Sequence, residues 1–208
     1  MATDLHRARL EVVTETLLAS GVRQVADLGC GHGELLQRLR DQAQFERLLG
    51  VDIDPQALAI AREQLGLDLL SSDQRLQLCR GSFEDTLWAN GTDIDAVVLL
   101  ETIEHIDPGR LSRVERAVFG QIHPALILVT TPNKEYNPLH GMPSGERRHP
   151  GHRFEWTRAQ FSAWCIGVAK RQGYSVAFRG IGDPDPGLGS STQMACFCRQ
   201  AGNQLDDH

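Results

Sequence analysis

Short apolar runs alternate with amphipathic segments along the chain, and this alternation constrains the fold more than any other feature of the sequence. Helical spacing of apolar residues occurs at residues 5–19, 34–44, 54–67, 111–119 and 157–171. Apolar runs of strand length occur at residues 23–28, 48–53, 76–79, 93–100, 125–130, 174–178 and 194–198. This order is typical of a mostly parallel sheet with helices on both faces. We therefore predict an α/β fold with seven strands, the last two forming a late antiparallel hairpin.

The 208 residues, 41% of them hydrophobic, are enough for one sizeable core, and we predict a single domain over residues 1–208. Within it we expect an N-terminal helical segment at 1–22, an insertion at 133–156 and a disordered tail at 200–208. The insertion lacks periodicity and is rich in Gly, Pro, His and Arg. Loops of that length are usually functional or disordered.

Several features predict a cytoplasmic protein that does not enter a membrane. No stretch approaches the roughly 18–20 consecutive apolar residues that a membrane span needs, and the start of the chain is polar and charged. The five cysteines, an odd number without a Cys-x-x-Cys pair, do not form a disulfide framework. The net charge of −6 argues against a protein that clamps long stretches of nucleic acid. Cations and histidines gather between residues 133 and 158, so we expect any nucleic acid to bind there.

Three glycines alternate over residues 29–33, between the first predicted strand and a helix. Glycine lets the backbone turn sharply and approach a ligand closely. Asp52 lies about 20 residues further on, at the end of the next strand, where a carboxylate can bind the ribose hydroxyls of an adenosine. Dinucleotide-binding loops carry a glycine where this chain has Glu34. With Asp27 just before it, this acidic loop suits a nucleotide cofactor with a cationic amino-acid tail.

The motif at residues 27–31 (Asp-Leu-Gly-Cys-Gly), together with Gly50-Val51-Asp52, resembles the Rossmann-like class I S-adenosylmethionine-dependent methyltransferases. The resemblance implies S-adenosylmethionine as the cofactor, with the glycine loop at its methionine part and Asp52 at its ribose. It also implies that residues 82 and 83 lie near the adenine. The cofactor-binding residues expected in this way are Asp27, Gly29, Cys30, Gly31, Gly33, Asp52, Ile53, Ser82 and Phe83.

Ligand-type side chains follow the apolar run at residues 96–100 without a gap, as Glu101, Glu104 and His105. On one helical turn, positions i, i+3 and i+4 share a face. The carboxyl ends of parallel strands are where ligands bind in open α/β sheets. Taken singly, these residues fit a solvated helix face. Together, beside a methyl-donor loop, they predict a cradle for a divalent cation.

The motif at residues 101–105 (Glu-Thr-Ile-Glu-His) and the one at residues 152–158 (His-Arg-Phe-Glu-Trp-Thr-Arg) closely resemble those of the small-RNA 2′-O-methyltransferases. This family modifies the 3′ ends of plant microRNAs, of animal Piwi-bound RNAs and of RNAs handled by bacterial repair systems. The similarity runs from about residue 7 to about residue 199. It implies a divalent metal held by Glu101, Glu104, His105 and His152, with His149 as a competitor for the last position. Oxygen and nitrogen ligands suit Mn²⁺ or Mg²⁺, and the imidazoles favour Mn²⁺.

The resemblance also implies the reaction, which is methylation of the 2′-hydroxyl of the 3′-terminal nucleotide of RNA. Only that nucleotide offers neighbouring free 2′ and 3′ hydroxyls, which a metal with two open positions can bind together. Glu104, His105 and His152 are the candidate catalytic groups, and the sequence does not choose the proton acceptor among them. Candidate RNA contacts are Lys134, Arg147, Arg148, His149 and Arg153. The expected partners are an RNA 3′ end and, in a bacterial repair setting, an RNA end-healing kinase-phosphatase and ligase.

Two alternatives stay open at this point. A metal-dependent O-methyltransferase acting on a small catechol would use adjacent oxygens in the same way. A non-catalytic RNA-end-binding subunit would keep the fold, although the complete set of ligand types argues against it. The chain shows no resemblance to the extra modules of larger relatives, so we expect an excised domain or a stand-alone form.

Overall fold

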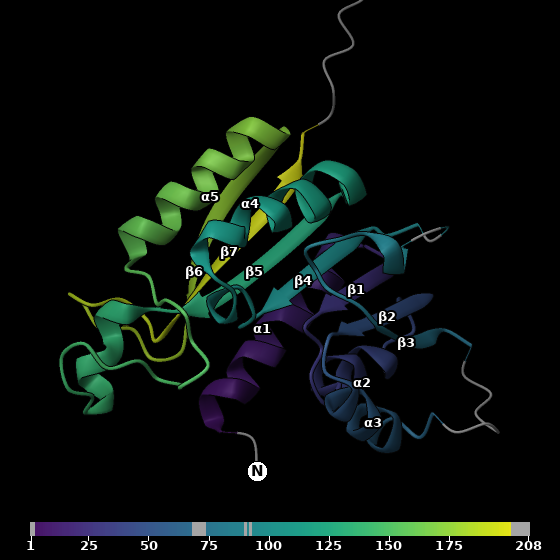
Figure 1. Ribbon diagram of the computed structural model, residues 1–208, viewed down its shortest axis with the longest axis horizontal. Helices are drawn as coiled ribbons and strands as arrows, with labels where there is room; N and C mark the ends of the chain where they lie inside the picture. The colour runs from purple at the N-terminus through teal and green to yellow at the C-terminus, as the bar shows by residue number, and fades with distance from the viewer. Residues whose placement is uncertain (1–2, 68–73, 90, 92, 201–208) are drawn as a thin grey trace, which may run out of the picture.

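The structure is a computed structural model that describes residues 3–67, 74–89, 91 and 93–200. Within these residues, one sheet holds seven strands in the order β3-β2-β1-β4-β5-β7-β6 (Figure 1). The pairs among β1 to β5 are parallel, whereas β7 runs antiparallel to β5 and to β6. The predicted α/β fold with a late hairpin is confirmed. The strands are β1 (Gln24–Leu28), β2 (Arg47–Asp52), β3 (Leu76–Arg80), β4 (Ala96–Leu100), β5 (Leu126–Pro132), β6 (Tyr174–Ile181) and β7 (Thr192–Arg199).

Helices cover both faces of the sheet and bury an apolar core against each. One core takes Leu10, Leu36 and Leu58 from the helices of the first half of the chain. The other takes Phe119 and Phe161 from the helices of the second half. The helices of the first face are α1 (Asp4–Ser20), α2 (Glu34–Arg40) and α3 (Pro55–Gln64), and those of the second are α4 (Leu111–Val114), its π-helical continuation η4 (Glu115–Ile122) and α5 (Arg158–Gln172). Short 3₁₀ turns are η1 (Leu87–Ala89), η2 (Ile103–His105), η3 (Pro108–Arg110) and η5 (Lys134–His140).

Several boundaries of strands and helices differ from the predicted ones. Strand β4 begins at Ala96 rather than at residue 93, and the carboxylate of Asp95 accepts the backbone N–H groups of Arg23 and Gln24 at 2.9 Å. Strand β5 continues to Pro132 because β7 pairs with it two residues beyond Thr130. Helix α2 ends at residue 40 rather than 44, and α3 ends at residue 64 rather than 67.

The two ends of the chain can be compared with the prediction only in part. Helix α1 confirms the expected N-terminal helix. The N–H of Gln200 donates to the carbonyl of Gly173 at 2.9 Å, so residue 200 continues the ordered chain. The rest of the predicted tail, residues 201–208, lies outside the described residues. Among the described helices, none has the length and apolar character that crossing a bilayer requires.

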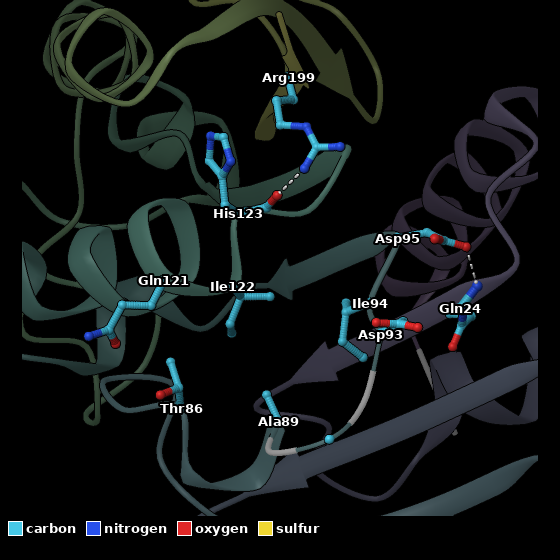
Figure 2. A pocket seen from close by; sticks show the side chains of 11 residues that line it. Gln24, Thr86, Ala89, Asp93, Ile94, Asp95, Gln121, Ile122, His123 and Arg199 are labelled. Carbon is cyan, nitrogen blue, oxygen red and sulfur yellow. Dashed lines mark hydrogen bonds between the residues drawn. The ribbon is translucent and has the colours of Figure 1, made fainter. Parts of the chain in front are cut away.

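A cavity of about 610 Å³ opens where β1 and β4 begin and β7 ends (Figure 2). Its polar wall groups are partly paired with one another, since Arg199 Nη1 donates to the carbonyl of His123 at 2.7 Å and Asp95 accepts from the N–H of Gln24. Ligands of parallel α/β sheets bind at the opposite edge, where the strands end. The predicted site residues lie at that opposite edge and not in this cavity.

Candidate active site

The predicted cofactor loop adopts a conformation that requires glycine. Gly29, Gly31 and Gly33 have φ values of 78°, 53° and 83°, in the left-handed region. The N–H groups of Gly29 and Cys30 both donate to the carbonyl of Val51, at 2.7 and 3.1 Å. The loop is therefore held against the end of β2 before the chain enters α2.

Two carboxyl groups flank this loop. Asp52 accepts the N–H of Gly31 at 2.8 Å and that of Asp54 at 2.9 Å. Asp27 is 3% exposed, and burial, followed by the charge of Asp52, raises its pKa to about 7. A cationic ligand would favour the ionised form of Asp27. The side chain of Ile53 is 67% exposed beside Asp52 and offers an apolar surface to a ligand in the loop.

The glycine loop touches the turn that carries the predicted metal ligands. A Cβ atom on Gly29 would lie 2.4 Å from Cγ2 of Thr102 and 3.9 Å from Cε1 of Phe83. Ser82, the neighbour of Phe83, accepts the N–H of Glu84 at 3.1 Å. The cofactor residues and the cation cradle, predicted separately from the sequence, are thus adjacent.

The turn after β4 is not the single α-helical turn expected from the spacing. Glu101 has a φ of 53°, a left-handed conformation that is uncommon outside glycine, and only residues 103–105 form a 3₁₀ turn. The N–H of Glu101 donates to the carbonyl and to the hydroxyl of Thr130, at 3.2 and 3.0 Å. These bonds hold the strained residue in place, and strain of this kind is concentrated at functional sites.

Glu101 has a partner that the sequence did not indicate. Arg9 of α1 places Nη2 2.9 Å from Glu101 Oε2, and its Nε donates to the hydroxyl of Thr192 at 2.8 Å. Thr130 donates to the other carboxylate oxygen at 2.9 Å. In the sequence, Arg9 resembles any charged residue on the solvent face of an amphipathic helix, so no feature of the sequence identified it as part of the site. Burial still raises the pKa of Glu101, in spite of the Arg9 charge.

Glu104 is fully buried and incompletely paired. Its Oε2 accepts from the hydroxyl of Thr131 at 3.0 Å, whereas its Oε1 has no hydrogen-bond partner among the described residues. Burial, followed by the charge of Glu101, raises its pKa well above the ordinary value. An unsatisfied buried oxygen is costly. A bound cation would supply the missing partner and favour the ionised form, so Glu104 fits a metal ligand.

Three imidazoles meet beside this turn. The ligand atoms of His105, His149 and His152 all lie within 4.8 Å of one another. The ring centroids of His105 and His152 are 4.8 Å apart, and that of His149 is 5.5 Å from each. Burial, followed by the other two histidines, lowers the pKa of His105 and favours the neutral ring that binds metals. Neither Glu101 nor Glu104 belongs to this cluster, so the structure does not bring the four predicted ligands within 4.8 Å of one another.

His152 is oriented by a carboxylate. It is 7% exposed, and its Nδ1 lies 2.6 Å from Glu155 Oε1. Although burial opposes it, hydrogen bonds from His152, Asn137 and the N–H of Arg148 hold the pKa of Glu155 below its ordinary value. An ionised Glu155 accepts a hydrogen bond from the Nδ1–H group of His152 and leaves the Nε2 lone pair available. This arrangement is the usual support of a metal-binding histidine.

His149 differs from His152 in its surroundings, and this difference allows a test. Its ring is exposed, and among the residues that the structure describes its Nδ1 accepts only the N–H of Gly151, at 3.0 Å. We expect His152→Ala to reduce methyl transfer about 100-fold or more, in keeping with the loss of an oriented metal ligand, and His149→Ala to reduce it less than tenfold. Initial rates at saturating Mn²⁺ measure both. An inactive His149→Ala beside an active His152→Ala would reverse the assignment.

The predicted RNA contacts fall into two groups. Arg148 is tied into the insertion, since its guanidinium donates to Asn137 Oδ1 at 2.6 Å and to the carbonyls of Ser191 and Asn133 at 2.9 and 2.6 Å. The structure thus shows it bracing the loop. The other four are exposed and stay predicted contacts, namely Lys134, Arg147, His149 and Arg153.

Comparison with known proteins places this geometry in a family. A family model described as a methyltransferase domain matches residues 25–124. The small RNA 2′-O-methyltransferase of Mus musculus is 32% identical over 95% of this chain and 52% of its own length. The methyltransferase domain of the bacterial protein CtHen1 is 39% identical, with a TM-score of 0.84 over 95% of this chain and 100% of that domain. The chain belongs to the small-RNA 2′-O-methyltransferase family. Family membership confirms the predicted class I methyltransferase fold and supports S-adenosylmethionine as the cofactor.

The share of each relative that the chain covers determines which family properties can be applied to this chain. The chain spans about half the length of the curated vertebrate relatives it matches. A structure described as the Pnkp1/Rnl/Hen1 RNA repair complex aligns with 96% of this chain at 21% identity and a TM-score of 0.69, which shows a shared fold. The chain covers the bacterial methyltransferase domain over its full length.

Proposed function

We propose that this chain methylates the 2′-hydroxyl of the 3′-terminal nucleotide of RNA, using S-adenosylmethionine and a divalent metal ion. The observation that carries the proposal is Glu104, a buried carboxylate with an unpartnered oxygen in the residue directly before His105, whose ring centroid lies 4.8 Å from that of His152. Thr102, two residues earlier in the same turn, has its methyl group against Gly29 of the glycine loop. A methyl donor in that loop and an acceptor at the histidines would be neighbours, and such proximity supplies much of the acceleration in a transfer reaction.

The residues that would hold the metal are Glu101, Glu104, His105 and His152. A bound dication lowers the pKa of a hydroxyl group and orients it. Two imidazoles among the donors favour Mn²⁺ over Mg²⁺, which prefers oxygen ligands. Arg9 is not one of these ligands, but it forms an ion pair with Glu101 and so offsets part of the negative charge of the ligand set.

The protein's own groups suit the proton transfer as well. The lowered pKa of His105 keeps its ring neutral at pH 7, and its side chain is exposed, so it can accept the proton of an incoming hydroxyl. Glu104 is buried, and its raised pKa favours the protonated form in the absence of a cation. A ring nitrogen that binds the metal cannot also take up a proton, so His105 could act as the base only where it is not a ligand, and the proton acceptor stays open among Glu104, His105 and His152. Lys134, Arg147 and Arg153 are exposed cations of the same insertion, and their positive charge is suited to the last phosphates of an RNA.

A series of RNA ends tests the proposed substrate. We expect methyl transfer to an oligonucleotide with a free 2′,3′-diol, and at least about 100-fold less to ends that lack either hydroxyl. The assay counts labelled methyl groups on oligonucleotides identical except at the last ribose. Efficient methylation of a 3′-deoxy end would rule out recognition of both hydroxyls. Methylation of catechol in preference to RNA would favour the small-molecule O-methyltransferase instead.

We also propose a bacterial RNA repair setting. The support is the high identity to a bacterial methyltransferase domain and the fold shared with a Hen1 protein whose complex contains Pnkp1 and Rnl. The corresponding partners of this chain would be an RNA end-healing kinase-phosphatase and a ligase. Co-purification of the chain with those enzymes from its own source would support this setting, and their absence from the purified material would count against it.

A further inference from the structure

A cavity of about 200 Å³ lies between the N-terminal end of α5 and strands β6 and β7. Its lining includes Asn133, the residue directly after β5, and Gln193 of β7. Gln193 pairs in register with Thr131, which donates a hydrogen bond to Glu104. Residues opposite each other in an antiparallel pair point to the same face of the sheet. The cavity therefore lies on the same face of the sheet as Thr131 and its partner Glu104, but at β7 rather than at β5.

An aromatic ring forms one wall of the cavity. Phe178 of β6 is 43% exposed, which is unusual for a phenylalanine in a strand that follows a packed helix. Its ring meets Phe161 of α5 edge to face, with centroids 6.2 Å apart and an interplanar angle of 72°. Phe161 is itself buried, so Phe178 is supported from behind while part of its ring faces solvent. Exposed, fixed rings are the platforms on which single-stranded nucleic acids stack their bases.

Positive charge lies around the same cavity. Arg158 is fixed by Glu135, whose Oε2 is 2.9 Å from its Nε, and by the carbonyl of Gly187, to which its Nη2 donates at 2.7 Å. Arg179, next to Phe178, is exposed and forms no salt bridge within the described part of the chain. Arginine beside an aromatic platform is suited to the phosphate attached to a stacked base.

The inner wall carries an acceptor without a partner. Gln193 is 6% exposed, and its Nε2 donates to the carbonyls of Pro132 and Trp156, at 3.1 and 2.9 Å. These two bonds fix which end of the amide is the nitrogen. The Oε1 atom is buried and has no hydrogen-bond partner among the described residues. A ligand that fills the cavity and donates an N–H would relieve the cost of this unpaired acceptor.

We infer that this cavity binds a nucleobase of the RNA strand, upstream of the 3′-terminal nucleotide. The base stacks on Phe178 and donates an N–H to Gln193 Oε1. Each of the four RNA bases has an N–H on its pairing edge, so the site holds a base without selecting one. The inference rests on the proposed function, because it assumes that the methyl acceptor is an RNA whose end lies at the histidine cluster.

The test compares Phe178→Ala with the wild-type chain on RNAs in which a single upstream nucleotide is made abasic. Stacking of one base on an aromatic ring is worth about 1–3 kcal/mol, so we expect KM for intact RNA to rise about tenfold in the variant with kcat little changed. In the wild-type chain, an abasic nucleotide at one upstream position should raise KM by the same factor. The variant should be insensitive to that abasic nucleotide. Phe178→Trp, which keeps a platform, should retain the wild-type KM.

Ile166→Ala is the matched control, because Ile166 is an exposed apolar residue of α5 outside the cavity lining. It should leave KM unchanged. If Phe178→Ala has the wild-type KM and keeps the wild-type response to every abasic position, the inference is wrong and the proposed function stands. If the wild-type chain methylates none of these RNAs, the proposed function itself fails.

Discussion

Glu104→Gln is expected to reduce methyl transfer by about 100-fold or more, since metal-supplied stabilisation of a reacting oxygen amounts to several kcal/mol. Glutamine has the shape of glutamate but cannot ionise, so it removes the negative charge from the buried position whose Oε1 lacks a partner. Single-turnover rates with labelled S-adenosylmethionine and RNA measure the loss. Cofactor affinity, measured by calorimetry, should stay within about twofold, because the glycine loop contacts Thr102 and not Glu104.

Stability gives a second readout for this variant. Because burial raises the pKa of Glu104, its ionised form destabilises the metal-free fold, and the amide should leave the melting temperature equal or higher. Mn²⁺ should raise the melting temperature of the wild-type chain and not that of Glu104→Gln. Glu146→Gln, at an exposed glutamate of the insertion, is the matched control and should behave as wild type in both assays. A Glu104→Gln variant that transfers methyl groups at more than a tenth of the wild-type rate would remove Glu104 from the metal site.

Gly29→Ala is expected to weaken cofactor binding about 100-fold or more and to destabilise the fold by about 2–4 kcal/mol. The alanine would be strained at a φ of 78°, and its Cβ would lie 2.4 Å from Cγ2 of Thr102. Relief of that clash must move either the cofactor loop or the turn of the metal ligands. Thermal unfolding should show a loss of about 5–15 °C, and calorimetry should show the loss of affinity.

Gly21→Ala separates the two causes of this effect. Gly21 ends α1 with a φ of 74°, and a Cβ there would meet no atom within 4 Å. It therefore carries the conformational strain alone, which we expect to cost about 1 kcal/mol, with cofactor affinity unchanged. If Gly21→Ala and Gly29→Ala lower the melting temperature equally, the contact with Thr102 contributes nothing.

The architecture followed from the sequence because the strands are buried and short and the helices amphipathic, so the alternation is visible without tertiary information. The ends of elements were less predictable. Strand β5 gained Thr131 and Pro132 from its pairing with β7, a contact between segments about 60 residues apart. Such pairing depends on the assembled sheet and leaves no mark in the local pattern.

The candidate site was predictable where ligand-type residues sit together in the sequence. The structure brings His105 and His152 to adjacent positions, as the resemblance carried by the two motifs implied, and Glu104 directly precedes His105 in the same turn. Arg9 and Gln193 were missed because each reaches the site from a distant part of the chain as an ordinary arginine or glutamine. The turn itself was predicted as helical because side-chain spacing says nothing about the left-handed backbone of Glu101, which the bonds to Thr130 maintain.

Mass-spectrometric mapping of the product, with Mn²⁺ and with a chelator, tests the central claim that a metal held by Glu101, Glu104, His105 and His152 directs methylation to the last ribose. The account predicts one methyl group, on the 2′ oxygen of the 3′-terminal nucleotide, formed only when Mn²⁺ is present. A methyl group on a base or on an internal ribose, or an equal yield in the chelated reaction, would contradict it.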